Sequence, residues 1–263
     1  MKSAVVPAVS AEPLAKRIAR AGLCSRREAE ELVRQGRVTV DGRPIDTPGL
    51  HVGAGCDVRI DGEPLPEPQP PRLFRFHKPR GVVVSRRDPA GRPTVWDLLP
   101  REFQRLLPVG RLDIASEGLL LLTNDGELKR RLELPATGWR RRYRVRAYGR
   151  VDPERLAALA RGLDIGGVRY GPVEVRLDRQ EGANGWYTVV LREGKNREVR
   201  RIFATLGLEV NRLIRVAYGP FQLGSLPKRR LAEVPAKVMR EQLGSLLEQS
   251  PISTREALRR LRS

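Results

Sequence analysis

The order of the expected elements predicts an α+β protein whose larger domain is built on a mixed, largely antiparallel sheet with flanking helices. Residues alternate in polarity over 143–148 and 186–191, as they do in strands. Helical spacing of apolar residues over 153–163 and 199–206 predicts helices among these strands. Because helices and strands are intermixed without regular βαβ alternation, a doubly wound parallel sheet is not expected. No glycine-rich phosphate loop is present, which argues against a nucleotide-driven motor or a dinucleotide enzyme.

The composition points to a polyanionic partner. The chain has 263 residues, enough for two domains, and 40% of them are hydrophobic, which argues against a disordered chain. The formal net charge is +19, so nucleic acid is the first expected partner and an anionic membrane surface the second. Arginines number 43 and lysines 7. Since arginine binds phosphate through two bonds and stacks on bases, this ratio favours RNA.

Nothing in the sequence predicts export or a membrane anchor. The longest apolar run is far shorter than the roughly 20 residues of a spanning helix, and residues 1–10 make too weak a signal peptide. Cys24 and Cys56 are isolated, so we expect reduced thiols and a cytoplasmic location. His51 and His77 are isolated as well, without zinc-ligand spacing. We therefore expect no metal ion, no organic cofactor and no membrane partner.

The first expected domain covers residues 12–65. Ser25 and Glu28 form a capping box, which predicts a helix start, and helical spacing predicts an earlier helix over 14–22. An Asp-Gly turn within 38–45 predicts a short strand pair. The domain is thus expected to consist of two helices followed by short strands, with basic residues along the helices and at the strand entry.

This arrangement, with the segments Leu23–Ala29 and Gly36–Gly42, resembles an S4 domain. The resemblance implies that its cations bind RNA phosphates, and the alternative is a solvated charged face. The candidate RNA-binding residues of this domain are Lys16, Arg17, Arg20, Arg26, Arg27, Arg34 and Arg37.

Proline dominates the segment 66–71, which predicts an extended, semi-rigid linker. The larger domain is expected to span 72–238, followed by a helical, basic extension over 239–263. Further expected elements of the larger domain are strands over 73–76 and 82–84 and short helices over 94–99 and 127–132.

One acidic residue of the larger domain, Asp113, stands out. It follows Gly110 and Arg111 and precedes the apolar run Leu119–Leu122, which must be buried. That order holds a carboxylate at the end of a rigid element, where a catalytic group is best placed. An aspartate near a glycine can also be a turn residue, and Asp125 is better explained that way.

Four further segments accompany the block from Gly110 to Gly126. They are Phe76–Gly81, Arg142–Val145, Gly194–Phe203 and the closing strand Leu213–Phe221. With that block they resemble the motifs of the RsuA/RluB family of bacterial ribosomal RNA pseudouridine synthases. In the first segment His77 replaces the usual asparagine of the family.

The resemblance implies a catalytic role for three residues. Asp113 would start the isomerisation of uridine to pseudouridine, Tyr143 would stack on the target base, and Arg200 would pair with the aspartate. Attack on the sugar, attack on the base and removal of a ribose proton all stay open. Without the resemblance, Tyr143 could equally be a packed strand aromatic, and Arg200 could bind phosphate alone.

Ribosomal RNA or a ribosome assembly intermediate is the expected partner of a monomeric enzyme. The block around Asp113 is closest to the RluB-like branch, which implies a stem-loop of 23S large-subunit RNA. The alternatives are a 16S small-subunit enzyme of the RsuA branch and a non-catalytic ribosome assembly or RNA-binding factor. An acid–base hydrolase would need a second carboxylate or a histidine near Asp113, which the sequence does not indicate. Further candidate RNA contacts in the larger domain are Lys78, Arg111, Arg142, Lys195, Arg197 and Arg201.

Overall fold

A computed structural model describes residues 11–248, and internal contacts divide this part of the chain into two compact units. The first unit comprises 11–71 together with 124–126 and 243–248, and the second comprises 72–123 and 127–242. None of the helices in the described residues is long and apolar enough to cross a membrane.

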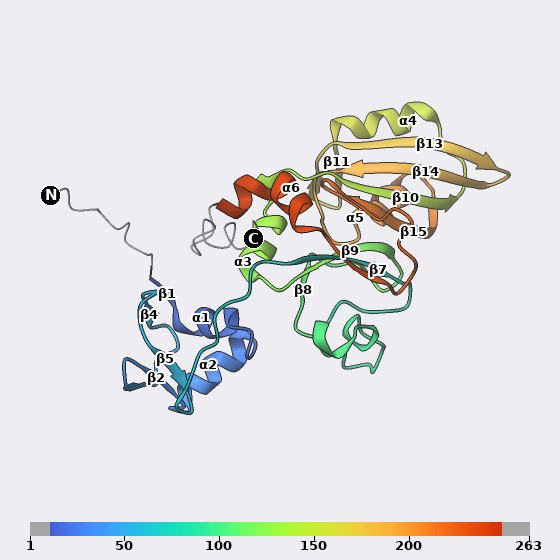
Figure 1. Cartoon of the computed structure of the whole chain (residues 1–263). Coiled ribbons are helices and arrows are strands. Elements are labelled where there is room, and N and C mark those ends of the chain that lie inside the picture. The colour runs from blue at the N-terminus through green and yellow to red at the C-terminus, as the bar shows by residue number, and fades with distance from the viewer. Residues whose placement is uncertain (1–10, 249–263) are drawn as a thin grey trace. The chain divides into compact units, whose positions relative to one another are not determined.

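The first unit packs two helices against short strands (Figure 1). Its elements are α1 Leu14–Arg20, α2 Arg26–Arg34, β1 Glu12–Pro13, β2 Val38–Val40, β3 Arg43–Ile45, β4 His51–Val52, β5 Val58–Ile60 and β6 Glu63–Pro64. The predicted capping box is confirmed, because the Glu28 amide donates to Ser25 Oγ and the Ser25 amide donates to the Glu28 carboxylate. The predicted hairpin is confirmed too, with Asp41 and Gly42 at positive φ between β2 and β3. Residues 65–72 form neither helix nor strand.

The second unit is built on a sheet with the strand order β13-β14-β10-β15-β9-β7-β17. These strands are β7 Leu73–Lys78, β9 Glu117–Thr123, β10 Arg141–Tyr148, β13 Val173–Glu181, β14 Asn184–Leu191, β15 Glu209–Tyr218 and β17 Leu231–Glu233. Two short strands lie outside this order: β8 Leu107–Val109 pairs with β9, and β16 Phe221–Gln222 pairs with β15. Every neighbouring pair of the main order is antiparallel except β9 and β15, which are parallel. The prediction of a mixed, largely antiparallel sheet is therefore confirmed.

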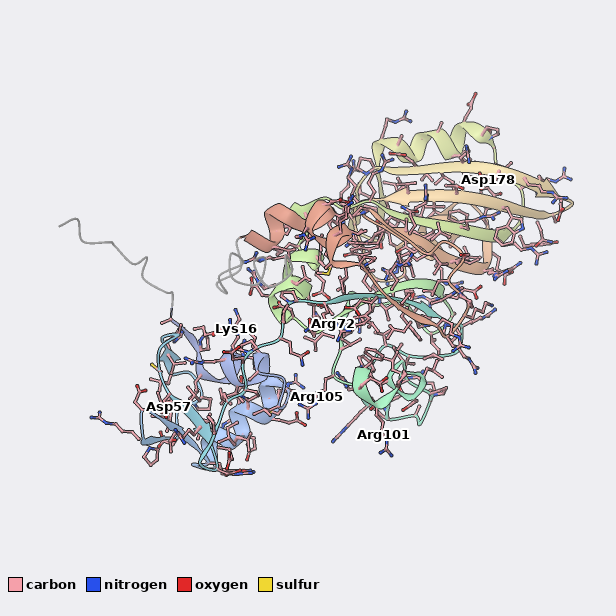
Figure 2. All side chains as sticks on the ribbon, viewed as in Figure 1. Lys16, Asp57, Arg72, Arg101, Arg105 and Asp178 are labelled. Atoms are coloured by element: carbon pink, nitrogen blue, oxygen red, sulfur yellow. The ribbon has the colours of Figure 1, made fainter. Side chains whose placement is uncertain are left out.

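Helices flank this sheet, with α4 next to β13 and α5 next to β15 (Figure 1). The remaining elements are α3 Gly126–Glu133, α4 Pro153–Ala158, α5 Glu198–Thr205, α6 Ala236–Glu248, the 3-10 turns Trp96–Leu98, Arg101–Phe103, Pro135–Thr137 and Leu159–Arg161, and the pair β11 Leu163–Ile165 and β12 Val168–Tyr170. Arg72, labelled in Figure 2, precedes β7. It makes two hydrogen bonds with Glu233, of 2.7 and 2.6 Å, which tie the start of β7 to the edge strand β17.

The apolar run that follows Asp113 forms β9, one of the inner strands. All residues of β9 are buried, and the leucines from Leu119 to Leu122 have no exposed surface, as predicted. Gly118 adopts a φ of 109°, and a Cβ atom there would lie 2.3 Å from the carbonyl oxygen of Arg215. Only glycine therefore allows β9 and β15 to approach in this way.

Three expectations are corrected by the structure. Residues 82–84 are not a strand, because Val83 makes only an isolated bridge to Thr94. Strand β7 continues past residue 76 to Lys78. The helix expected over 153–163 ends at Ala158, and Gly162, with a φ of 75°, turns the chain into β11. Of the basic extension expected over 239–263, the part up to 248 belongs to α6, and 249–263 lie outside the described residues.

Candidate active site

The loop 110–116, between β8 and β9, carries Asp113. Each carbonyl oxygen from residue 113 to residue 116 accepts a hydrogen bond. The donors are, in order, Nζ of Lys78 at 3.1 Å, the amide of Gly81 at 2.8 Å, Nη2 of Arg200 at 3.1 Å and again Nζ of Lys78 at 2.8 Å. The Asp113 carboxylate itself makes no hydrogen bond or ion pair with any residue of 11–248. The backbone is thus fixed while the carboxylate is free for a ligand.

Lys78 is the main anchor of this loop. Its side chain has no exposed surface, and its ammonium donates to the carbonyl oxygens of Pro79, Asp113 and Ser116. Burial lowers the pKa of Lys78 to about 8, although the carboxylates of Asp113 and Glu117 act in the opposite direction. A buried ammonium with three acceptors cannot also bind RNA phosphate, so the predicted RNA contact of Lys78 is replaced by a structural role.

Arg200 holds the same loop from α5. Its terminal nitrogens donate to the carbonyl oxygens of Val210 at 2.8 Å and Ala115 at 3.1 Å. Burial and, after it, the nearby Arg197 lower the pKa of Arg200, while Asp113 raises it. The expected ion pair between Arg200 and Asp113 is not formed. Arg200 instead fixes the backbone two residues after the aspartate.

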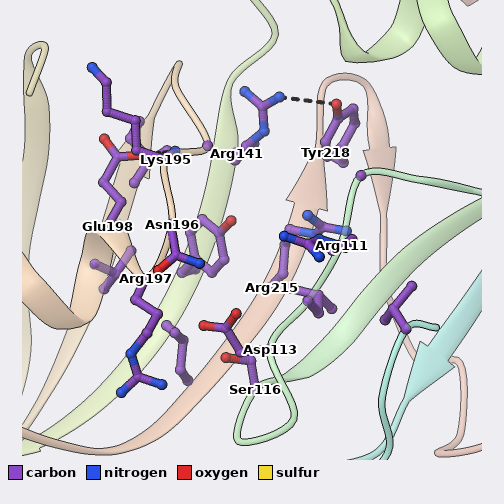
Figure 3. A pocket seen from close by; sticks show the side chains of 18 of the residues that line it. Arg111, Asp113, Ser116, Arg141, Lys195, Asn196, Arg197, Glu198, Arg215 and Tyr218 are labelled. Carbon is purple, nitrogen blue, oxygen red and sulfur yellow. Dashed lines mark hydrogen bonds between the residues drawn. The ribbon is translucent and has the colours of Figure 1, made fainter. Parts of the chain in front are cut away.

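Asp113 lines a pocket of about 550 Å³, which lies in the size range of small-molecule sites (Figure 3). Tyr143 contributes from β10, and Leu213 and Arg215 contribute from β15. Only 8% of Tyr143 is exposed, and its strand register places it opposite Arg215. The pocket therefore combines an unpaired carboxylate, an aromatic wall and an apolar wall.

Basic side chains predominate around this pocket, which suits a polyanionic substrate. The charged lining residues are Arg111, Lys129, Arg141, Lys195, Arg197 and Arg215, against Asp113, Glu133 and Glu198. Arg111 and Arg197 are exposed and make no side-chain hydrogen bond or ion pair within the described chain. Arg197 also adopts a left-handed φ of 51°, an uncommon conformation for a residue with a side chain.

The other predicted RNA contacts of this unit are less available. Lys195 lines the pocket, but its ammonium bonds Glu193 and the carbonyl oxygen of Arg169. Arg201 is exposed, donates weakly to a tyrosine hydroxyl at 3.4 Å, and is not among the lining residues. Arg142 alternates with Tyr143 along β10 and therefore points to the opposite face of the sheet.

Sequence reasoning did not assign a role to four charged residues of the pocket, Lys129, Glu133, Glu198 and Arg215. Glu198 is buried at the start of α5, where its carboxylate accepts a hydrogen bond of 2.9 Å from the Lys195 amide. Burial raises the pKa of this carboxyl group. Arg215 interrupts an apolar alternation in its strand, and that interruption was a readable signal. Arg141 belongs to the arginine-rich run over 140–146, which the sequence predicts to bind the RNA backbone. Nothing in the local sequence marks Glu198.

His77, which stands where the resembling family has asparagine, is part of β7. Its Nδ1 lies 2.7 Å from the carbonyl oxygen of Leu226, and its backbone bonds Arg229 and Arg230. The side chain does not line the pocket. In this protein His77 connects β7 to the segment before β17.

Most of the basic residues predicted to bind RNA in the first unit have partners within it. Arg17 donates to the carbonyl oxygens of Gly53, Ala54 and Cys56. The other four form ion pairs: Arg20 with Glu12, Arg26 with Glu30, Arg34 with Glu31, and Arg37 with Asp61. The hydrogen bonds from Arg37 lower the pKa of Asp61. Lys16 is half-buried, and Arg27 is exposed without a partner in the described chain.

No group of His, Cys, Asp and Glu side chains that could hold a metal ion occurs within residues 11–248. What the pocket offers is one available carboxylate, the aromatic rings of Tyr143 and Tyr218 and several cations. This set suits proton transfer or covalent attack on a nucleotide whose phosphates are bound at the rim.

An enzyme that acts on RNA fits these features, and comparison with known proteins defines its family. Residues 72–205 match the family described as RNA pseudouridylate synthase, and residues 12–58 match the S4 domain. The chain belongs to the RNA pseudouridylate synthase family, and it is an isomerase with an N-terminal S4 domain.

Similar proteins agree with this family. An RNA pseudouridine synthase of Rickettsia felis is 44% identical over 86% of this chain and 98% of its own length. The ribosomal large subunit pseudouridine synthase B of Yersinia pestis is 42% identical over 86% of this chain and 73% of its own length. The protein of the same name from Salmonella typhi is 44% identical over 81% and 75%.

A solved crystal structure of a pseudouridylate synthase has the same architecture. It superposes with a TM-score of 0.63 at 27% sequence identity and covers 88% of this chain and 99% of its own.

Proposed function

We propose that this pseudouridine synthase isomerises one uridine in a stem-loop of the 23S large-subunit ribosomal RNA. Support comes from the relatives of Yersinia pestis and Salmonella typhi, both named as large-subunit enzymes. The S4 domain and the basic rim of the pocket are compatible with a folded RNA substrate.

The observation that carries the proposed site is the unpaired carboxylate of Asp113 on a fixed loop in this pocket. The reaction breaks the bond between C1′ and N1 of the uridine and forms a bond between C1′ and C5. Asp113 starts it by attacking the sugar, by attacking the base or by removing a ribose proton. All three need a carboxylate without a competing partner, held in one position relative to the ribose.

Tyr143 supplies the surface for the target base. A uridine inside an RNA stem must leave the stack to reach the carboxylate, and it then needs an aromatic or apolar surface to replace its neighbours. Tyr143 and Leu213, both lining the pocket, offer these surfaces. Arg111 and Arg197, exposed at the rim, bind the flanking phosphates.

Mapping pseudouridines in ribosomal RNA from cells with and without this protein tests the proposal. We expect one site in the 23S RNA to lose its pseudouridine in the deletion strain. Restoring the wild-type protein should restore the modification, whereas Asp113→Asn should not. Loss of a site in 16S RNA alone would overturn the proposed target. Unchanged modification in both RNAs would instead favour an assembly or RNA-binding role.

A further inference from the structure

Arg215 is a charged residue at a position of β15 that the strand otherwise uses for apolar side chains. The register with β10, which shifts between Arg142 and Tyr143, places Leu213, Arg215 and Tyr218 on the face of Tyr143. These three residues are exposed by 6%, 2% and 1%. The sheet register places Arg215 between Tyr143 on β10 and Gly118 on β9. Because Gly118 lets the backbone of β9 approach the backbone of Arg215, this arginine is fixed beside the proposed stacking surface.

The hydrogen bonds of its guanidinium are incomplete. Nε donates to the carbonyl oxygen of Leu119 at 2.7 Å, and the group lies 5.1 Å from the ring centroid of Tyr218. Neither terminal nitrogen has an acceptor within residues 11–248, and Nη2 is also shielded from solvent. Burying a cation with unmade hydrogen bonds is unfavourable, so an acceptor supplied by a ligand is the physical reason for such an arrangement.

The terminal nitrogens of the other two cations near Asp113, the buried Lys78 and the half-buried Arg200, do have acceptors, although Nε of Arg200 has none within residues 11–248. Lys78 donates to three carbonyl oxygens, and Arg200 uses both terminal nitrogens on backbone carbonyls. Arg215 lines the same pocket as Asp113 and Tyr143, and Figure 3 labels both Arg215 and Asp113 among the lining side chains. Lys78 and Arg200 thus hold the loop, and the terminal nitrogens of Arg215 are available to the substrate.

We propose that the terminal nitrogens of Arg215 donate to a carbonyl oxygen of the target uracil and stabilise the negative charge that the base acquires during the reaction. The inference rests on the proposed roles of Asp113 and Tyr143, and it does not depend on which ribosomal RNA is modified. Tyr143 would hold the plane of the base, and Arg215, its cross-strand neighbour, would bind the edge.

The electron balance supports this role in each of the open pathways. Attack of the carboxylate on C1′ expels the base with the electron pair of the bond to N1. Removal of the C2′ proton by the carboxylate expels the base in the same form and leaves a double bond between C1′ and C2′. Addition of the carboxylate to C6 pushes the electron pair of the C5–C6 double bond toward O4.

In all three, a carbonyl oxygen of the base gains negative charge before C1′ bonds to C5. A proton then leaves C5 and one is taken up at N1, so no redox partner is needed. A fixed donor at the oxygen that gains charge stabilises the transition state more than the ground state.

Single-turnover rates at saturating RNA measure this role. The substrate is a synthetic stem-loop around the uridine found by mapping, and product is measured by nuclease digestion and chromatography. We expect Arg215→Gln to lower the rate by about 10²–10³-fold, the effect of losing one donor to a developing oxyanion. Arg215→Lys should be milder, because it keeps the charge. RNA affinity should change by no more than a few-fold.

The matched control is Arg212→Lys, on the same strand, which keeps a positive charge beside the carboxylate of Glu117, the ion-pair partner of Arg212. Its rate should equal that of the wild type. A folded Arg215→Gln variant that loses affinity but keeps its saturated rate would overturn the proposal.

Sulfur substitution in the substrate provides a second measurement, and its first part uses the wild-type enzyme alone. Sulfur accepts hydrogen bonds more weakly than oxygen, so 2-thiouridine or 4-thiouridine at the target should slow the wild-type enzyme. We expect this effect at one of the two positions, and we expect Arg215→Lys to be less sensitive at that position. A wild-type rate unaffected by sulfur at both positions would overturn the proposal.

Failure of the proposed function has a different signature. If wild-type protein acts only on a 16S fragment, the target is wrong and the Arg215 experiment continues with that fragment. If Asp113→Asn retains turnover, the proposed site is wrong whatever Arg215 does.

Discussion

The arginines of the S4 domain and the buried cations around the pocket bind different kinds of partner. In the S4 domain, Arg20, Arg26, Arg34 and Arg37 all pair with carboxylates of the same domain, mostly at the surface. Around the pocket, buried cations bind carbonyl oxygens, so the carboxylate of Asp113 keeps no partner.

This difference shows that a count of basic residues does not measure the charge that RNA can use. A surface ion pair in water contributes little to stability, and RNA can replace the carboxylate at small cost. A buried cation that binds carbonyl oxygens cannot turn to RNA in this way, because its departure would leave those oxygens without a hydrogen bond. The comparison predicts large effects at the pocket and small, additive effects in the S4 domain.

The largest expected effect is that of Asp113→Asn. The amide keeps the shape of the side chain but can neither attack nor remove a proton, so the single-turnover rate should fall by more than about 10³-fold. RNA affinity should stay within a few-fold, because this carboxylate makes no contact that holds the fold. Binding and rate can be measured on the same stem-loop. A well-folded Asn variant with substantial turnover would place the chemistry elsewhere.

Tyr143 should show a smaller effect than Asp113 or Arg215, and two variants separate the role of its ring from that of its hydroxyl group. Tyr143→Ala removes the stacking surface, which contributes roughly 1–3 kcal/mol, or about fivefold to 150-fold in rate. Tyr143→Phe keeps the ring and should be much milder. Equal losses for Phe and Ala would mean that the hydroxyl group does the work and that the stacking role is wrong.

The lowered pKa of Lys78, which anchors the loop of Asp113, predicts that the reaction rate depends on pH. Lys78 has a pKa of about 8, so raising the pH above this value leaves an amine with two N–H groups for three carbonyl acceptors. The loop that carries Asp113 should loosen, and the rate should fall by up to tenfold per pH unit. Single-turnover rates between pH 7 and pH 10 measure this.

The contribution of Lys78 to the free energy of unfolding should instead increase as the pH rises. The folded pKa of Lys78 lies below its ordinary value of 10.5, so between the two values the unfolded chain binds more protons than the folded chain. This group therefore adds to the free energy of unfolding as pH rises through that range. A rate loss that tracks a falling melting temperature would contradict loop loosening at Lys78. Lys228→Met, which alters an exposed lysine, should keep the wild-type pH profile.

The smallest expected effect compares two arginines of the S4 domain. Arg27 is exposed without a partner in the described chain, whereas Arg37 makes two hydrogen bonds with Asp61. If Arg27 contacts a phosphate, Arg27→Gln should lower the slope of log affinity against log salt by about 1. Arg37→Gln should change it less. Equal slopes for both variants and the wild type would exclude Arg27 from the phosphate contacts.

Much of the architecture follows from local sequence. The capping box of Ser25 and Glu28, the Asp-Gly hairpin and the buried strand from Leu119 to Leu122 each depend on neighbouring residues, and all were predicted. The position of Asp113 before that strand was equally readable. Such features are short-range, so their physical causes are present in the sequence itself.

Other features depend on segments far apart in the chain. The strand expected over 82–84 is absent because strand pairing needs a neighbouring chain as well as an apolar run. Tertiary contacts also bury Lys78 against residues 113–116. They direct the hydrogen bond of Arg200 to the carbonyl oxygen of Ala115 rather than to the carboxylate of Asp113. The sequence determined which residues carry charge, and only the folded structure decided which of those charges are already bound and which stay open to RNA.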